Sequence, residues 1–173
     1  DKATILKNAS KTNLDPLAEA KLIADQLRTI DGLDLVLFGK QAIDDDLQSL
    51  GPMVATLLDL PCVSSIEHFE KDGNEVTVKR PIEGGSETVQ LELPAVLTTD
   101  KGINQPRYAA LKGIMAAKKK PIETIDVDGT PHEKTKVEQL AAPPARPEGR
   151  IIGEGVAAVP ELIKLLRDEA KVL

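Results

Sequence analysis

Residues 78–98 constrain the fold of this chain more than any other stretch. They read VKRPIEGGSETVQLELPAVLT. Gly84 and Gly85 follow Glu83 and tolerate positive φ angles, so a tight reversal of the chain costs little strain there. Apolar side chains then alternate with polar ones, at Val89, Leu91 and Leu93. The pattern predicts a strand, a tight turn, a second strand with one buried face, and a short third strand.

Helical and strand patterns alternate before and after this region. Asp15 and Pro16 form a typical helix start, because an aspartate caps the first turn and proline fits the first helical position. The apolar run 33–38 predicts a strand buried on both faces. A second helix is expected after Ile43, with inward apolar residues at Leu47, Leu50, Val54, Leu57 and Leu58. With a further strand at 122–127, this order predicts an α/β fold with a Rossmann-like, mostly parallel sheet and an added β-hairpin region.

The C-terminal part of the chain follows a different pattern. Helix-breaking residues cluster at Pro143, Pro144, Pro147 and Gly149. They predict an extended arm, followed by an amphipathic helix over residues 159–170. The apolar stripe of that helix consists of Val159, Leu162, Ile163 and Leu166. We therefore expect an α/β domain over residues 1–141, and an arm plus helix over residues 142–173 whose stripe needs another surface to cover it.

Composition excludes several classes of function. The net charge of -6 supplies no broad basic surface for nucleic acid. No apolar run approaches the length of a membrane span, so no membrane insertion is expected. Cys62 is the single cysteine, which rules out an internal disulfide and suits a reducing compartment; after Pro61 it is expected to be buried. His68 and His132 are far apart, and no catalytic triad or metal-ligand spacing occurs, so no independent catalytic site is expected.

The loop after the apolar run 33–38 is where a ligand is expected, because ligands of open α/β sheets bind beyond the carboxyl ends of strands. Gly39 lets a ligand approach the backbone, and Lys40 can place a positive charge near a phosphate. A helix N-terminus after Ile43 would present free N–H groups to an anion. The three carboxylates at 44–46 would repel a phosphate, so they are expected to cap the helix or to bind ribose hydroxyls, with a metal site as a minor alternative. From these residues alone, a plain strand-to-helix connection explains the loop equally well.

A second candidate site lies in residues 104–115, NQPRYAALKGIM. Pro106 disfavours helix for the residue before it, which predicts an extended segment. Tyr108 is the only tyrosine of the chain. A short helix is expected over residues 108–117. It carries Leu111, Ile114 and Met115, and the pattern alone favours the core for the last two.

Three segments, in this order, resemble the electron transfer flavoprotein β-subunit family. They are LVLFGKQAIDDD at 35–46, the strand-and-turn region at 78–98, and NQPRYAALKGIMAAKKKPIE at 104–123. The resemblance extends over nearly the whole chain and is weakest at 128–148. It implies that the family's N-terminal part, with its first strand and first glycine-containing loop, has no counterpart here. Several of the family's contacts to nucleotide and flavin would then be missing from these residues.

The resemblance implies a function in electron transport and fatty acid oxidation. The chain would pair with an α subunit that holds most of the FAD site, and the C-terminal arm and helix would pack on that subunit. The heterodimer would accept electrons from flavoprotein dehydrogenases, such as acyl-CoA dehydrogenases, and pass them to a quinone oxidoreductase. The flavin would carry out the redox chemistry. The compartment implied is the bacterial cytoplasm or, alternatively, the mitochondrial matrix.

The resemblance also implies binding residues. A structural AMP would be bound by Gly39, Lys40, Gln41, Ala42, Ile43, Asp44, Asp45, Asp46 and Gln48. Partner proteins would dock on Tyr108, Leu111, Ile114 and Met115, with Leu111 as an exposed anchor. Two alternatives stay open: an electron-bifurcating or nitrogen-fixation-type relative with FAD in the β-subunit site, and a non-redox nucleotide-binding regulatory module of the same fold.

Overall fold

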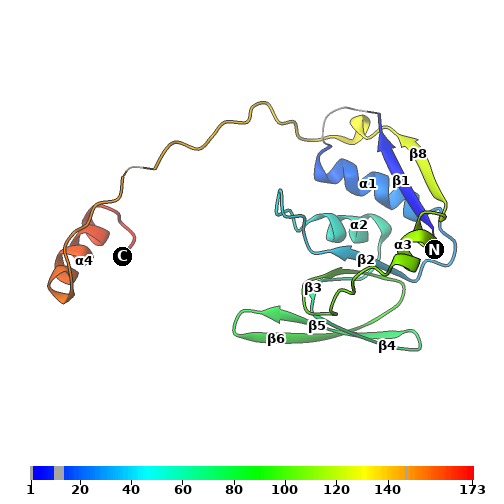
Figure 1. The fold of residues 1–173 in the computed structure, drawn as a ribbon, viewed down its shortest axis with the longest axis horizontal. Coiled ribbons are helices and arrows are strands. Elements are labelled where there is room, and N and C mark those ends of the chain that lie inside the picture. Colours follow the sequence, from blue (N-terminus) through cyan, green and yellow to red (C-terminus); the bar gives the residue numbers. More distant parts are fainter. Residues whose placement is uncertain (1, 10–13, 147) are drawn as a thin grey trace. The chain divides into compact units, whose positions relative to one another are not determined.

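The computed structural model describes residues 2–9, 14–146 and 148–173. The chain divides into two compact units, Asp1–Lys136 and Val137–Leu173. The elements of the first unit are β1 (Ala3–Asn8), α1 (Pro16–Leu27), β2 (Leu35–Gly39), α2 (Leu50–Leu58), β3 (Cys62–Ile66), β4 (His68–Asp72), β5 (Glu75–Ile82), β6 (Gly85–Glu92), β7 (Ala95–Thr99), α3 (Leu111–Ala117) and β8 (Ile122–Val127). A short 3-10 turn, Thr130–His132, follows β8 (Figure 1).

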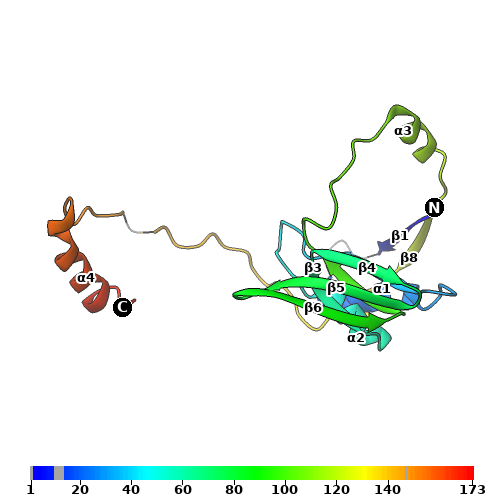
Figure 2. The same cartoon turned by 90° about the horizontal axis from the view of Figure 1, so that it is seen from below.

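The strands form three sheets. Strands β2, β7 and β3 are parallel in that order, and β1 pairs with β8 in a separate parallel ladder. Strands β4, β5 and β6 form an antiparallel sheet, seen as a flat layer in Figure 2. The predicted α/β class with a mostly parallel sheet and an added hairpin region is confirmed. The parallel part is split, however, because β1 and β2 flank α1 in the chain and yet belong to different sheets.

The predicted hairpin and short strand at 78–98 are confirmed, and they carry much of the core. Strands β5 and β6 pair from Glu75↔Glu92 to Ile82↔Gly85, and β7 follows as a separate parallel strand. The core where the two kinds of sheet meet contains Val63, Ile66, Val76, Val78, Leu93, Ala95 and Leu97. A second cluster joins α1 to α2 through Ala20, Ala24 and Val54. Helix α2 therefore packs on the sheet that carries β2 and β7, and α1 packs on α2.

Helix α1 begins as predicted, with Asp15 as N-cap and Pro16 in the first turn. The Asp15 carboxylate accepts a hydrogen bond from the backbone N–H of Ala18 at 2.8 Å. It also accepts from the backbone N–H groups of Lys134 and Thr135, the latter at 2.8 Å. Several backbone hydrogen bonds lower the pKa of Asp15 to about 2, and the bond from the Lys134 N–H has the largest effect. One side chain thus caps α1 and fixes the segment after β8.

Replacing Asp15 by asparagine should lower the melting temperature at neutral pH by about 2–6 °C, because an amide binds these N–H groups less strongly than a carboxylate. The Asp15 pKa is lowered on folding, so its contribution is complete above about pH 4 and is lost as the pH falls towards pH 2. The difference between wild type and Asp15→Asn should shrink over the same range. Thermal unfolding between pH 7 and pH 3 measures it, with Asp25→Asn as the surface control. A difference independent of pH would contradict this prediction.

The prediction that the strand at 33–38 is buried on both faces is wrong. Strand β2 pairs only with β7 among the described strands, and Leu37 is 58% exposed. The apolar run is correct for a strand, but its position at a sheet edge depends on neighbours that the sequence pattern does not reveal. The expected burial of Cys62 is also wrong. Cys62 is exposed at the start of β3.

The predicted start of the second helix is also wrong. Helix α2 begins at Leu50, and a loop occupies residues 40–49. Leu47, expected to point inward from that helix, lies in the loop and is 46% exposed. Val54 is fully buried, and Leu50, Leu57 and Leu58 pack around it as expected. The consequence is a longer strand-to-helix connection than the sequence pattern indicated.

The second unit contains a short 3-10 turn, Val156–Ala158, and helix α4, Val159–Asp168. None of the residues of α4 is buried, although Val159, Leu162 and Ile163 form an apolar stripe. Arg150 forms an ion pair with Glu169 within this unit. Pro147, predicted to be part of the arm, lies outside the described residues. Across the described part of the chain, no helix combines the length and the apolar character needed to cross a membrane.

Candidate functional site

The carboxyl ends of β2, β7 and β3 lie side by side. Gly39 pairs with Thr99, and Thr99 pairs with Ile66. The backbone bonds continue beyond the strands: the Lys40 N–H donates to the Thr99 carbonyl at 2.9 Å, and the Asp100 N–H donates to the Ile66 carbonyl at 2.9 Å. This edge is where open α/β sheets bind ligands. The loop that follows Gly39 is therefore anchored where a ligand is expected.

Lys40 is held by a carboxylate that the sequence analysis did not single out. Its Nζ donates to Asp100 Oδ2 at 2.8 Å, and both side chains are about 30% exposed. The Lys40 hydrogen bond is the largest cause of the lowered pKa of Asp100. Asp100 follows β7 directly, at the strand end where functional side chains gather, and that position was the only sequence signal for it. The positive charge of Lys40 thus lies at the carboxyl ends of the strands, and Asp100 partly balances it.

The three aspartates of the loop do not cap α2, contrary to expectation. The N-cap position is Ser49, which makes no capping bond with its side chain. Instead, Asp46 Oδ1 accepts from Gln41 Nε2 at 2.6 Å, and Asp45 Oδ1 accepts from the Leu47 N–H at 3.1 Å. These bonds fold the loop on itself, with Asp46 at a φ of 55°. The carboxylates therefore shape the loop, and their remaining oxygens face outward.

The space next to the strand end is open. A Cβ atom added to Gly39 would meet no atom within 4 Å. Ile43 at the loop tip is 99% exposed. The loop also offers amide groups at Gln41 and Gln48. Open space beside a strand end, carboxylates that can accept from hydroxyl groups, and backbone N–H groups at the start of α2 that can donate to a phosphate together fit a nucleotide.

Helix α1 adds an acidic side chain to this region. The pKa of Glu19 is raised, first by its burial and then by the charges of Asp45 and Asp15. The sequence analysis missed this contribution, since Glu19 is distant from the loop in sequence. In spite of these acidic side chains, no group of three metal-ligating side chains is found in the described parts of the chain.

The second predicted site lies on an exposed element. Figure 2 shows α3 at the end of a loop that projects from the sheets, and none of the seven residues of α3 is buried. Tyr108 is 103% exposed and Leu111 is 75% exposed, while Ile114 and Met115 are 43% and 54% exposed. The interpretation of Ile114 and Met115 as core residues is therefore wrong. The exposure of Leu111 is what an anchor requires, although its docking role stays a prediction.

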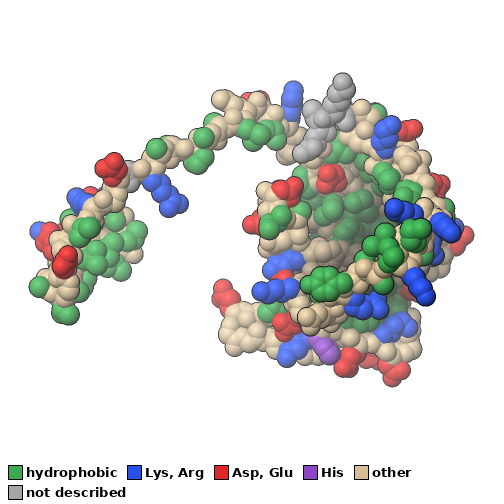
Figure 3. Space-filling model, viewed as in Figure 1, with side chains coloured by type: hydrophobic (Ala, Val, Ile, Leu, Met, Phe, Trp, Pro, Cys, Tyr) green, Lys and Arg blue, Asp and Glu red, His purple; other side chains and the backbone are tan. Residues whose placement is uncertain are grey.

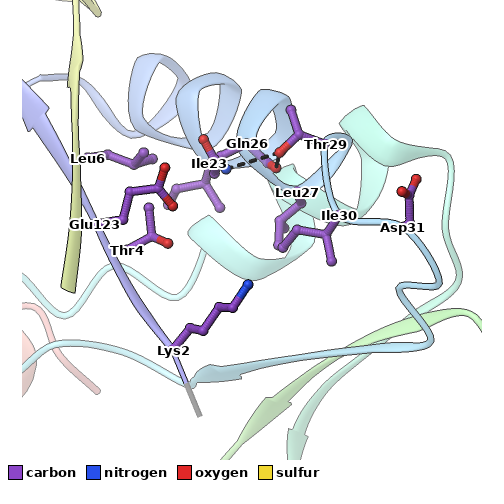
Figure 4. Close-up of a pocket in the computed structure, with 10 residues that line it drawn as sticks. All are labelled: Lys2, Thr4, Leu6, Ile23, Gln26, Leu27, Thr29, Ile30, Asp31 and Glu123. Carbon is purple, nitrogen blue, oxygen red and sulfur yellow. Dashed lines mark hydrogen bonds between the residues drawn. The ribbon is translucent and has the colours of Figure 1, made fainter. Parts of the chain in front are cut away.

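A separate cavity of about 800 Å³ lies between β1, α1 and β8 (Figure 4). Lys2, just before β1, borders it together with Thr4 and Leu6 of β1 and Glu123 of β8, and Ile23 and Leu27 of α1 supply apolar lining. The cavity thus extends along β1 beside α1. None of the predicted site residues lines it.

Comparisons with known proteins identify the family. The family model described as "Electron transfer flavoprotein domain" matches residues 1–130. The electron transfer flavoprotein subunit beta of Bacillus subtilis is 38% identical over 147 residues, which are 81% of this chain and 57% of that protein. The mitochondrial subunit beta of Arabidopsis thaliana is 42% identical over 163 residues, 91% of this chain and 63% of that protein. The Bradyrhizobium diazoefficiens subunit beta is 40% identical over 170 residues, 98% of this chain and 67% of that protein. The chain thus spans less than two thirds of the first two relatives, and it belongs to the electron transfer flavoprotein β-subunit family.

Proposed function

We propose that the chain acts as the β subunit of a heterodimeric electron transfer flavoprotein. The observation that carries this proposal is the family match over residues 1–130, together with 38–42% identity to proteins named electron transfer flavoprotein subunit beta. In the proposed complex, FAD is bound mainly by the α subunit and supplies the redox chemistry. The chain itself contributes a rigid sheet, a nucleotide-binding loop and a docking segment. It has no catalytic site of its own.

The proposed electron path runs from flavoprotein dehydrogenases, such as acyl-CoA dehydrogenases, to a quinone oxidoreductase. Tyr108, Leu111, Ile114 and Met115 form the docking residues for these partners. They are exposed on an element that contributes nothing to the core, so their apolar surface is open to a partner. The proposed location is the cytoplasm of a bacterium or the mitochondrial matrix, and this proposal is supported by one bacterial and one mitochondrial relative.

The nucleotide proposed for the loop at 39–48 is AMP. The absence of a side chain at Gly39 leaves room for it, and the outward carboxylates of Asp44 and Asp45 can accept from ribose hydroxyls. The N–H groups at the start of α2 can donate to its phosphate. Lys40, oriented by Asp100, adds positive charge at the same edge. These residues bind and orient the nucleotide, which here has a structural role.

Replacing Gly39 by valine should remove the bound nucleotide while leaving the chain folded. A Cβ atom at this position meets no protein atom within 4 Å, so the new side chain has room and occupies the space of the ligand. Nucleotides released from the purified native heterodimer can be identified and counted by chromatography. Wild type should release one AMP in addition to one FAD, and the variant should release FAD with less than about a tenth of the AMP, a loss of more than 1.4 kcal/mol in binding.

The same measurement separates the alternatives. A wild-type heterodimer with two FAD and no AMP would favour the electron-bifurcating relative, and one with no nucleotide besides the α-subunit FAD would refute the nucleotide role of the loop. The non-redox regulatory module is disfavoured by the family match, since the matching family is an electron transfer flavoprotein family. A chain that forms no complex with an α subunit would revive it.

A further inference from the structure

Strand β6 forms the outer margin of the antiparallel sheet, and one of its edges has no partner strand. The strand order is β4-β5-β6, so β6 pairs with β5 on one side only (Figure 2). Its eight residues make it the longest edge strand in the described parts of the chain. An open edge presents a row of N–H and C=O groups that can pair with another strand.

The pairing of β5 with β6 shows which backbone groups of β6 point outward. The Leu93 N–H donates to the Asn74 carbonyl at 3.0 Å, so Leu93 is one of the residues that bond towards β5. In an antiparallel ladder, such residues alternate with residues whose backbone groups point away. Within the described parts of the chain, no backbone hydrogen bond from another segment reaches the latter. They are Ser86, Thr88, Gln90 and Glu92.

Strand β6 lacks the features by which edge strands usually avoid pairing, namely short length, lysine, proline and bulges. Residues 85–92, GSETVQLE, contain neither lysine nor proline, and their register with β5 is continuous. Glu87 is paired with Arg80 of β5 at 2.6 Å. By contrast, β4 at the other edge of this sheet has only five residues and includes Lys71. The edge of β6 is therefore open to a further strand.

The sequence of β6 is complementary to itself in the antiparallel direction. When Val89 meets Val89 of a second copy on a twofold axis, Thr88 lies opposite Gln90, and Ser86 lies opposite Glu92. All outward residues of the two copies then face one another and form roughly eight backbone hydrogen bonds. No two like charges are opposite in this register, which would otherwise be destabilising. A shift by one residue leaves one outward residue of each copy without a partner.

We infer that two copies of the chain pair through β6 and join their antiparallel sheets into one. Figure 3 shows basic and acidic side chains interspersed over the lower part of the molecule, where this sheet lies, so no field of one sign surrounds the edge. The net charge of -6 on each copy still causes repulsion at longer range, and salt should therefore strengthen the dimer. Because a strand edge is a small interface, the dimer is a weak one that depends on protein concentration.

The test uses the full chain and measures the dissociation constant of the dimer by sedimentation velocity. Thr88 and Gln90 are exposed, so changing them leaves the core intact. Thr88→Glu/Gln90→Glu places like charges opposite each other at two points of the dimer and should raise the dissociation constant about tenfold. Thr88→Glu/Gln90→Lys places opposite charges there and should lower it about tenfold. The control Lys2→Gln/Lys136→Gln has the net charge of the first variant and should leave the constant nearly unchanged.

A cysteine on the twofold axis tests the register. In a Cys62→Ser background, Val89→Cys should form a disulfide-linked dimer with oxidised glutathione, because opposite Cα atoms of such a non-hydrogen-bonded pair are about 4.5 Å apart. Lys71→Cys on β4 should stay unlinked. A chain that is monomeric at every concentration, or equal dissociation constants for the two charge variants, would overturn the inference. It also fails if the like-charge variant self-associates as wild type does but no longer co-purifies with an α subunit, since the edge then belongs to that subunit.

Discussion

Replacing Gly51 by valine should lower the free energy of unfolding by about 3 kcal/mol, or roughly 6–12 °C in melting temperature. A Cβ atom at Gly51 would lie 2.4 Å from Thr98 Cγ2 and 3.4 Å from Phe38 Cδ2. Thr98 is 2% exposed, and its hydroxyl accepts from the Ser65 N–H at 2.8 Å, so its side chain cannot rotate away without breaking that bond. The substitution therefore pushes α2 away from β7.

The milder variant Gly51→Ala provides the comparison if the valine variant does not accumulate. Alanine usually stabilises a helix interior by about 1 kcal/mol relative to glycine. Gly113 of α3 has no atom within 4 Å of an added Cβ, so Gly113→Ala should cause no loss of stability. Gly51→Ala should destabilise the protein in spite of the same gain in helix propensity. Urea unfolding of both variants decides the matter, and equal stabilities would mean that the contact between α2 and β7 has room to adjust.

Removing residues 150–173 should abolish co-purification with the α subunit. The deletion takes away α4, whose apolar stripe is more than 40% exposed at Val159, Leu162 and Ile163 and needs a covering surface. The first unit should keep its melting temperature within about 2 °C, because both core clusters lie entirely within Asp1–Lys136. Affinity purification through a tagged α subunit, followed by a melting curve of the truncated chain, measures both effects.

Point variants refine this result. Leu162→Glu places a charge within the apolar stripe and should reduce the recovered heterodimer at least tenfold, since burying an unpaired carboxylate costs more than 1.4 kcal/mol. Lys164→Glu makes a larger change in charge on the polar side of the same helix and should have little effect. Full recovery of the truncated chain with the α subunit would show that the C-terminal arm and helix are not the interface.

Features encoded by local sequence were predictable. The hairpin of β5 and β6 follows from Gly84 and Gly85 between alternating strands, and the start of α1 follows from Asp15 and Pro16. The fold class followed from the order of these elements, and the family from three segments in the right order. The position of the candidate site followed from one rule about the carboxyl ends of strands.

Features that depend on distant contacts were not predictable. Three aspartates after Ile43 look like a helix start, but loop bonds such as the one between Gln41 and Asp46 use them before a helix can form. Asp100 can pair with Lys40 only because β7 lies beside β2. The exposure of Leu37 depends on which strands flank β2. No local pattern carries that information.

The pairing of β1 with β8 has a consequence for the order of folding. Ala3 pairs with Ile122, so closing this ladder means ordering almost the whole first unit, whereas β5 and β6 need only a two-residue turn. Both strands of the ladder are largely exposed and contribute little to the core. The ladder therefore forms late and opens early, and the backbone amides of β1 and β8 exchange with solvent before those of β5 and β7. Because Asp15 accepts hydrogen bonds from the backbone of residues 134 and 135, this segment stays bound to α1 when the ladder opens.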